Sequence, residues 1–223
     1  MVVAIYKPKG PTSHDIINQV RKLTGERRVG HAGTLDPLAS GVLVIGIGRE
    51  ATKKLGEIVA KEKEYLAVIR LGMTSTTDDE EGVKTATKYE KDVKIRKSDV
   101  TAILAQFTGR IMQTPPAYSA IKIKGQKAYA LARRGKTPAL KPRPVEIKSI
   151  KLLSYRWPNL KLRVVTGPGV YIRALARDIG EHVGVGGYLA DLVRTRVGDF
   201  TLHRAARLIE LPPAMLSRWG REP

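Results

Sequence analysis

The sequence predicts a mixed α+β fold, and the spacing of its apolar residues carries that prediction. Continuous apolar runs of strand length occur at 41–47 and 65–71, whereas 12–25 carries apolar residues at helical spacing. Strand-like and helix-like segments do not alternate one for one along the chain, which disfavours a doubly wound parallel sheet. Of the 223 residues, 42% are apolar, which is enough to form a core of one or one and a half domains.

The N-terminal quarter predicts a helix followed by a strand. Thr12 or Ser13 can cap a helix over 12–25, and Gly25 can end it. The run GVLVIGI at 41–47 is continuously apolar and of strand length, which predicts a strand. The apolar face of the helix is formed by Ile16, Ile17, Val20 and Leu23.

The next stretch predicts a helix, a strand, a hairpin tip and a second helix. Residues 49–59 read as helical despite an internal glycine, and 65–71 read as a strand. The acidic segment 77–82 is typical of a hairpin tip. A helix then begins with Ser98 as its cap and ends at Gly109.

The C-terminal half begins with a basic segment at 115–144, whose turn signals and clustered cations indicate an excursion from the core. Strands are predicted at 145–155 and 160–166, and a helix at 172–183 that stops at Gly184. A further helix is predicted to carry Leu189, Leu192 and Val193.

The charge balance points to a polyanionic partner. Lys and Arg number 40 against 21 Asp and Glu, a formal net charge of +19. Such a surplus is typical of proteins that bind nucleic acid or an anionic membrane, and no basic amphipathic helix or lipidation signal supports the membrane. With no cysteine and no metal-ligand spacing among its four histidines, the sequence predicts no metal site. Without a signal peptide or membrane span, we expect a cytoplasmic protein.

Two other patterns have simpler explanations than a binding site. Gly46, Gly48 and Ala51 form a GxGxxA pattern between a strand and a helix, which is the context of dinucleotide binding. No clear acidic residue at a strand end follows at the expected distance, and the elements beyond do not continue as βαβ units, so we interpret the pattern as a tight turn. The carboxylates of 78–81 could hold magnesium, but a solvated loop tip explains them more simply.

The segment GHAGTLDPLASGVL at 30–43 has no such simple explanation. Its glycines and Pro37 impose an irregular backbone, and Asp36 lies in its middle, just before a buried strand. Loops placed by a rigid strand often carry catalytic groups. An aspartate before proline can also do no more than cap a turn, and the segment by itself leaves both readings open.

Five segments in chain order resemble the motifs of the TruB family of tRNA pseudouridine synthases, and together they extend through nearly the whole chain. They are KPKGPTS at 7–13, GHAGTLDPLASGVL at 30–43, KEYLAVIRLG at 63–72, TPPAYSAIKIKGQKAYALARRG at 114–135 and GVYIRALARDIG at 169–180. The resemblance implies the pseudouridine synthase fold, a central mixed or antiparallel sheet flanked by helices. Residues 115–144 would be its basic insertion, the thumb.

The resemblance implies isomerisation of uridine to pseudouridine at position 55 in the T loop of tRNA. In the family the aspartate matching Asp36 is the nucleophile, and an ionised carboxylate can attack and later leave again. Whether it attacks uracil C6 or ribose C1′ stays open. The reaction has no redox step, so no cofactor is expected. The target uridine must be flipped out of the T loop before it can react.

The resemblance also assigns the residues around the base. Arg173 would keep the nucleophile ionised, although by itself it could be a surface arginine. Tyr65 would stack on the uracil and could serve in proton transfer, whereas an isolated strand tyrosine is more often core. Tyr171 and Leu192 would line the pocket, and His31 would fill space left by flipped nucleotides. Without the motifs these three are ordinary helix-face or structural residues.

The thumb is expected to grip the T arm through its cations, which contact phosphates without reading sequence. The RNA-binding residues implied are Lys9, Lys122, Lys124, Lys127, Arg133 and Arg134. The alternative is a solvated charged face, which explains exposure but not the excess of one sign.

Several details depart from the family pattern. Tyr6 stands where an aspartate is usual, and TGPGVYIR replaces SKGTYIR, which leaves the backbone before Tyr171 uncertain. We expect a catalytic domain over 1–210 with a short tail at 211–223, without the usual C-terminal RNA-binding domain, and a monomer. Two rivals stay open: a synthase acting on another structured RNA, and a non-catalytic RNA-binding protein of the same fold.

Overall fold

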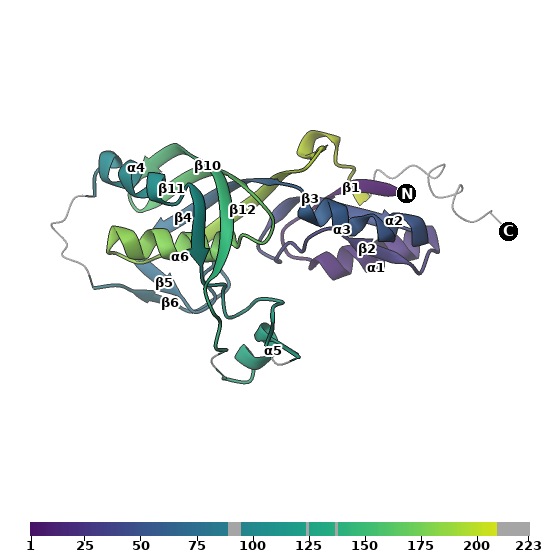
Figure 1. Cartoon of the computed structure of the whole chain (residues 1–223), viewed down its shortest axis with the longest axis horizontal. Helices are drawn as coiled ribbons and strands as arrows, with labels where there is room; N and C mark the ends of the chain where they lie inside the picture. The colour runs from purple at the N-terminus through teal and green to yellow at the C-terminus, as the bar shows by residue number, and fades with distance from the viewer. Residues whose placement is uncertain (89–94, 124, 137, 209–223) are drawn as a thin grey trace. The chain divides into compact units, whose positions relative to one another are not determined.

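The computed structural model describes residues 1–88, 95–123, 125–136 and 138–208 (Figure 1). Within them, the main sheet has nine strands and follows the order β1-β3-β12-β4-β11-β10-β7, with β2 beside β3 and β13 beside β12. It is mixed, because β12 pairs parallel to β3 whereas β1 pairs antiparallel to it. The predicted α+β class is confirmed. No helix in the described ranges is long and apolar enough to cross a membrane.

The chain divides into two compact units. The first comprises Met1–Tyr65 and the chain from Leu192 onward, and the second comprises Leu66–Asp191. Strands β4 and β12 contribute residues to both. The first unit contains β1 (Val2–Lys7), α1 (Ser13–Thr24), β2 (Val29–His31), β3 (Ser40–Ile47), α2 (Arg49–Lys53), α3 (Leu55–Ala60), the start of β4 (Lys63–Leu71), the end of β12 (Gly187–Val197), β13 (Phe200–Thr201) and a 3-10 turn (Leu202–Arg204).

Helix α1 forms as its sequence predicts. The Thr12 hydroxyl accepts the Asp15 amide at 3.1 Å, and the Asp15 carboxylate accepts the Thr12 amide at 2.8 Å, a reciprocal capping box. Gly25 ends the helix in the left-handed conformation. The predicted apolar face is buried except for Leu23, which is 43% exposed.

The segment predicted as a further helix around Leu192 is instead strand β12, and the helix prediction was wrong. Leu189, Leu192 and Val193 fit helical spacing by coincidence. Where β12 runs beside β3, with Val193 opposite Ser40, it is a parallel strand. Strands in parallel pairing are often covered on both faces and lack the alternation that identifies a strand from sequence.

The close approach of β12 to β3 depends on Gly41, which lies opposite Arg194 in the parallel register. Gly41 has φ +112°, a conformation that side chains rarely adopt. A β-carbon at this position would overlap the carbonyl oxygen of Arg194. The glycine is therefore required twice, for its conformation and for the space it leaves.

Gly41→Ala is expected to destabilise the protein by about 3 kcal/mol or more, from backbone strain together with overpacking. Urea unfolding followed by circular dichroism measures this. Gly56→Ala is the matched control: Gly56 lies in α3 with nothing within 4 Å of an added β-carbon, so alanine is expected to be neutral or mildly stabilising. Equal stability of the Gly41 and Gly56 variants would contradict the packing argument.

The helix predicted at 49–59 is two short helices, α2 and α3, which meet at Lys54. The backbone amide of Lys54 bonds the Ala51 carbonyl at 3.2 Å, which tightens the end of α2. Gly46, in the pattern considered for dinucleotide binding, lies where a β-carbon would press on the Ala51 backbone. That pattern is a tight strand-to-helix packing contact.

The second unit holds the rest of the sheet, two longer helices and two small hairpins. Its elements are the remainder of β4, β5 (Met73–Ser75), β6 (Lys84–Ala86), α4 (Lys97–Gln106), β7 (Gly109–Gln113), β8 (Lys122–Ile123), β9 (Gln126–Lys127), α5 (Ala128–Ala132), β10 (Arg143–Arg156), β11 (Asn159–Thr166), α6 (Ile172–Val183) and the first part of β12.

Most predicted elements of the second unit are confirmed. In β11, Leu160, Leu162 and Val164 are fully buried, as their alternation predicts. Helix α6 ends at Gly184 in the left-handed conformation. The predicted N-cap of α4, Ser98, was wrong, because Ser98 lies inside the helix. The N-cap is Arg96, whose amide bonds the Asp99 carboxylate at 2.9 Å.

Candidate active site

Asp36 lies in an irregular loop between β2 and β3, and buried polar groups of the first unit fasten the residues around it. The Ser13 hydroxyl donates to the Leu35 carbonyl at 2.9 Å and accepts the Leu35 amide at 2.8 Å. A single side chain thus satisfies both backbone groups of the residue before the carboxylate. The Asp36 carbonyl accepts the Ala39 amide at 3.0 Å, which closes a turn over Pro37.

Lys7 holds the far side of the same loop. Its ammonium is completely buried and donates to the Ala39 carbonyl at 2.7 Å and to the Pro8 carbonyl at 2.9 Å. The Pro37 carbonyl accepts the Gly10 amide at 2.9 Å. The segment KPKGPTS therefore fixes the loop from one side, and Asp36 is carried on a rigid backbone.

Arg194 lies on the opposite side of the loop. It is 2% exposed and donates to the carbonyls of Val42 at 2.8 Å and Gly33 at 3.0 Å. Its guanidinium is also close enough to the Tyr65 phenol and the Asp36 carboxylate to interact electrostatically with both. Burial lowers the pKa of Arg194, and Tyr65 and Asp36 oppose that shift.

Tyr65 is buried at the start of β4, at 7% exposure. Burial raises the pKa of its phenol, the charge and hydrogen bond of Arg194 lower it, and the Asp36 carboxylate raises it. The net direction is upward, so the phenol is neutral at physiological pH. A neutral phenol can donate its hydrogen to a bound base.

The other predicted residues of the first unit have different surroundings. His31 is partly buried at the end of β2, and its buried Nδ1 has no hydrogen-bond partner among the described residues. Burial, then repulsion by Arg194 and His14, lowers its pKa, so the imidazole is neutral near pH 7. Leu192 is buried on β12, and Lys9 is exposed.

Tyr171 lies in the second unit at the N-cap of α6. Its amide donates to the Gln113 side chain at 2.9 Å, and its carbonyl accepts from the same side chain at 3.1 Å. The Arg143 guanidinium lies 5.3 Å from the centre of the tyrosine ring and donates to the Gly169 carbonyl at 2.6 Å. These contacts order the backbone that departs from the family pattern.

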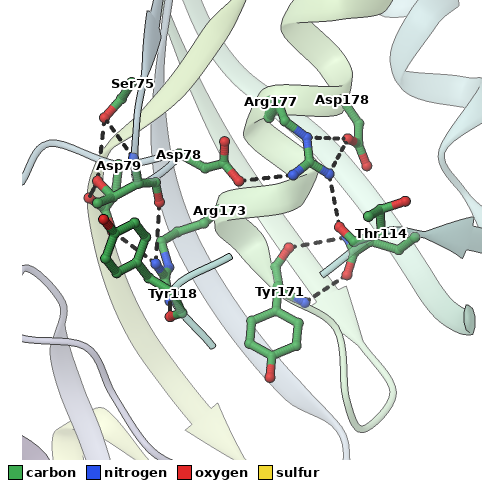
Figure 2. Close-up of polar contacts among 11 residues, drawn as sticks. Ser75, Asp78, Asp79, Thr114, Tyr118, Tyr171, Arg173, Arg177 and Asp178 are labelled. Atoms are coloured by element: carbon green, nitrogen blue, oxygen red, sulfur yellow. Dashed lines mark hydrogen bonds and ion pairs between the residues drawn. The ribbon is translucent and has the colours of Figure 1, made fainter. Parts of the chain in front are cut away.

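Arg173 follows in the first turn of α6 and is buried at 6% exposure, so it is not a surface arginine (Figure 2). Its guanidinium pairs with the Asp79 carboxylate at 3.3 Å and donates to the carbonyls of Thr77 at 3.2 Å and Tyr118 at 3.0 Å. Arg173 and Asp36 belong to different units, and their predicted pairing stays a prediction.

The acidic turn at 78–81 is not the solvated loop tip that its composition suggested. Asp79 is 2% exposed and pairs with Arg173, and Asp78 pairs with Arg177 at 2.9 Å (Figure 2). Arg177 lies one helical turn after Arg173 and also bonds Asp178. Burial raises the pKa of the Asp78 carboxyl, and the nearby arginines oppose it. The turn is an anchor for α6, while Glu80 and Glu81 are exposed.

The thumb forms a hairpin of β8 and β9 followed by α5. Four of the predicted RNA-binding residues, Lys122, Lys127, Arg133 and Arg134, are exposed there. Lys127 and Arg133 each lie 5.6 Å from the centre of the Tyr129 ring. Lys124 lies outside the described residues.

Four buried polar side chains that organise these sites were missed in the sequence: Lys7, Ser13, Gln113 and Arg194. Lys7 and Ser13 are the first and last residues of the KPKGPTS segment, which was recognised as a motif, but their burial was not predicted. Gln113 and Arg194 carry no signal at all, because most polar residues in these patterns are exposed.

Two family models match the chain. The model for the TruB family pseudouridylate synthase N-terminal domain matches residues 21–172. The model for the tRNA pseudouridylate synthase B C-terminal domain matches residues 173–219.

Similar proteins and structures agree with these matches. The chain is 47% identical over 218 residues to tRNA pseudouridine synthase B of Thermobifida fusca, covering 94% of this chain and 73% of that protein. It is 46% identical to the protein of the same name from Leifsonia xyli, covering 96% and 72%.

Among solved structures, a Cbf5-Nop10-Gar1 complex contains a chain that is 28% identical, with a TM-score of 0.73. An H/ACA RNP bound to a substrate RNA containing 2′-deoxyuridine contains one that is 25% identical, with a TM-score of 0.71. These two matches cover 94% and 99% of this chain. They cover about half of the longer chains in those structures, 53% and 56%. The expected pseudouridine synthase fold is confirmed, and the chain belongs to the TruB family of pseudouridylate synthases.

Proposed function

We propose that this protein converts the uridine at position 55 in the T loop of tRNA to pseudouridine, with Asp36 as the nucleophile. The observation that carries the proposal is the loop of Asp36, fastened by Ser13, Lys7 and Arg194. A carboxylate held on a rigid backbone can attack a base without first losing conformational freedom. The relatives named tRNA pseudouridine synthase B support tRNA as the substrate.

The reaction breaks the C1′–N1 and C5–H bonds, turns the uracil, and forms the C1′–C5 and N1–H bonds, so the product is an isomer of the substrate. Asp36 supplies the electron pair for the covalent step. Tyr65 stacks on the uracil while it turns, and its phenol relays the C5 proton: the oxygen accepts that proton as the phenol passes its own hydrogen to another acceptor. Arg173 keeps the nucleophile ionised in a water-poor pocket.

The remaining residues hold the flipped nucleotide. Tyr171 and Leu192 line the pocket, and a neutral His31 fills space left by extruded nucleotides. Lys9 is exposed, precedes Gly10, whose amide bonds the Pro37 carbonyl, and contacts phosphate. Flipping requires a few kcal/mol, which stacking and pocket contacts offset. No cofactor enters any of these steps, and the protein acts in the cytoplasm as a monomer.

The test is conversion of an unmodified tRNA transcript, read by release of tritium from uracil C5 and by mapping the modified position. Conversion at position 55 is the expected result. Conversion in another structured RNA but not in tRNA would support the closely related rival, and binding of tRNA without conversion would support a non-catalytic role.

The thumb cations are expected to contribute a large share of the salt dependence of tRNA binding. Replacing Lys122, Lys127, Arg133 and Arg134 by Gln removes four charges, which lowers the slope of log Kd against log salt by about 3 if each contacts a phosphate. Filter binding between 50 and 200 mM salt, a range of roughly fourfold, measures the slope.

The control removes the same charge from exposed cations of the first unit, Lys22, Arg27, Lys53 and Lys54. A smaller change in slope is expected there. Equal slopes for the two variants would mean that the thumb makes no special contact with RNA.

A further inference from the structure

Arg194 is a buried cation on β12 whose hydrogen bonds converge on the loop of Asp36. Its Nε donates to the Val42 carbonyl at 2.8 Å, Nη2 to the Gly33 carbonyl at 3.0 Å and Nη1 to the Thr34 carbonyl at 3.4 Å. Gly33 and Thr34 precede Asp36 by three and two residues, and Val42 lies on the strand that the loop enters. One side chain therefore ties the loop to the sheet.

The same guanidinium is close enough to the phenol of Tyr65, the second group of the predicted chemistry, to interact with it electrostatically. A guanidinium carries donors and no acceptor, so in a hydrogen bond between the two groups the phenol oxygen accepts. Such a bond directs the hydrogen of the phenol away from Arg194 and leaves it for another acceptor.

A buried guanidinium seldom makes a protein more stable than an apolar side chain of similar volume would. Removing a cation from water is unfavourable, and well-packed apolar residues of similar volume often stabilise a core as well or better. Arg194 is 2% exposed, and its acceptors are neutral carbonyls, with the Tyr65 phenol and the charge of Asp36 near enough to interact. The arrangement fits a residue retained for orienting other groups.

We propose that Arg194 is a positioning residue for the isomerisation: it holds the backbone that carries Asp36 and the hydroxyl of Tyr65 in one fixed arrangement. Arg194 acts through these two residues and does not itself contact the base. The inference rests on the proposed function for the reaction that is measured. Absence of conversion by the unaltered enzyme would count against that function, whereas the variants below test Arg194.

Arg194→Lys keeps the charge but cannot bond all three carbonyls, because an ammonium is a single donor centre. In single-turnover tritium release with saturating enzyme, the rate is expected to fall at least about 100-fold, while the Kd for tRNA changes less than about threefold. Rates are expressed per folded molecule, with the folded fraction measured by circular dichroism. Arg196→Lys is the control: Arg196 lies on the same strand and pairs with Glu62 at 2.6 Å.

A double-mutant cycle with Tyr65→Phe separates positioning from folding. If Arg194 acts through the phenol, Arg194→Lys has a much smaller effect on the rate once the hydroxyl is gone, so the two losses do not multiply. Arg194→Gly is expected to regain part of its rate with added guanidinium ion but not with sodium at equal ionic strength.

Three other outcomes would each contradict the proposal. Unchanged rates in Arg194→Lys, or losses that multiply fully with those of Tyr65→Phe, would remove the link to the phenol. A variant whose activity falls only in proportion to its folded fraction would assign Arg194 to folding alone. A loss equal to that of Arg196→Lys would show a general effect of altering β12.

Discussion

Asp36→Asn is expected to abolish formation of pseudouridine, with a fall of at least about 10⁴-fold in the single-turnover rate and little change in tRNA binding. The amide has nearly the same size and shape as the carboxylate, so the loop held by Ser13 and Lys7 keeps its conformation. What is lost is the electron pair and negative charge of the nucleophile.

The measurement pairs tritium release with filter binding on the same preparations. Asp199→Asn is a suitable control, because Asp199 is exposed in the turn between β12 and β13 of the same unit. Its conversion rate is expected to equal that of the unaltered enzyme. Full activity of Asp36→Asn would contradict the assignment of Asp36 as the nucleophile. Loss of tRNA binding would show that the carboxylate also contributes to the RNA-binding site.

The elements predicted correctly are those whose determining residues, such as helix caps and apolar runs, lie close together in the sequence. Helix α1 has its cap at Thr12, its capping partner at Asp15 and its stop at Gly25, all within one short segment. The buried strand β3 was identified by an uninterrupted apolar run. Such signals depend on neighbouring residues, and tertiary contacts seldom override them when several agree.

The prediction failed where the deciding contact is far away in sequence. The aspartate at 79 looked solvated because it lies among other acidic residues, but its partner Arg173 is 94 residues later. The spacing of Leu189 and Leu192 favoured a helix, whereas pairing between β3 and β4 in the sheet makes that segment strand β12. Arg194 gave no sign of burial, because arginine is mostly exposed and only its fitted acceptors allow it inside.

The same distinction applies to the candidate site. Asp36, Tyr65 and Arg173 were predicted as site residues from motifs, and their catalytic roles are proposals. The motifs say nothing about what holds those residues, and the structure supplies that information: Ser13 on Leu35, Gln113 on Tyr171 and Asp79 on Arg173. Positioning groups need only present a donor or acceptor at the right place, so their sequence signal is weak.

Arg173→Met is expected to lower the free energy of unfolding by about 3–5 kcal/mol, because it leaves the Asp79 carboxylate buried without its cation. The carboxylate keeps the Glu81 amide at 3.0 Å and the Thr77 hydroxyl, which do not neutralise its charge. Urea unfolding checks the loss. Asp79→Asn in the same chain removes the stranded charge and is expected to restore most of the stability.

Activity then separates structural from catalytic roles. The double variant Arg173→Met, Asp79→Asn is expected to fold but to convert tRNA at least about 100-fold more slowly, because Arg173 is proposed to keep Asp36 ionised. Its control is Arg177→Met with Asp78→Asn, which removes the Asp78–Arg177 ion pair one turn further along α6, together with the pair of Arg177 and Asp178. That control is expected to stay within about tenfold of the unaltered rate. If the Arg173 double variant is stable and has normal activity, Arg173 only anchors the acidic turn. Asp36 would then need another cation to keep it ionised, and Arg194 is near enough to interact with its charge.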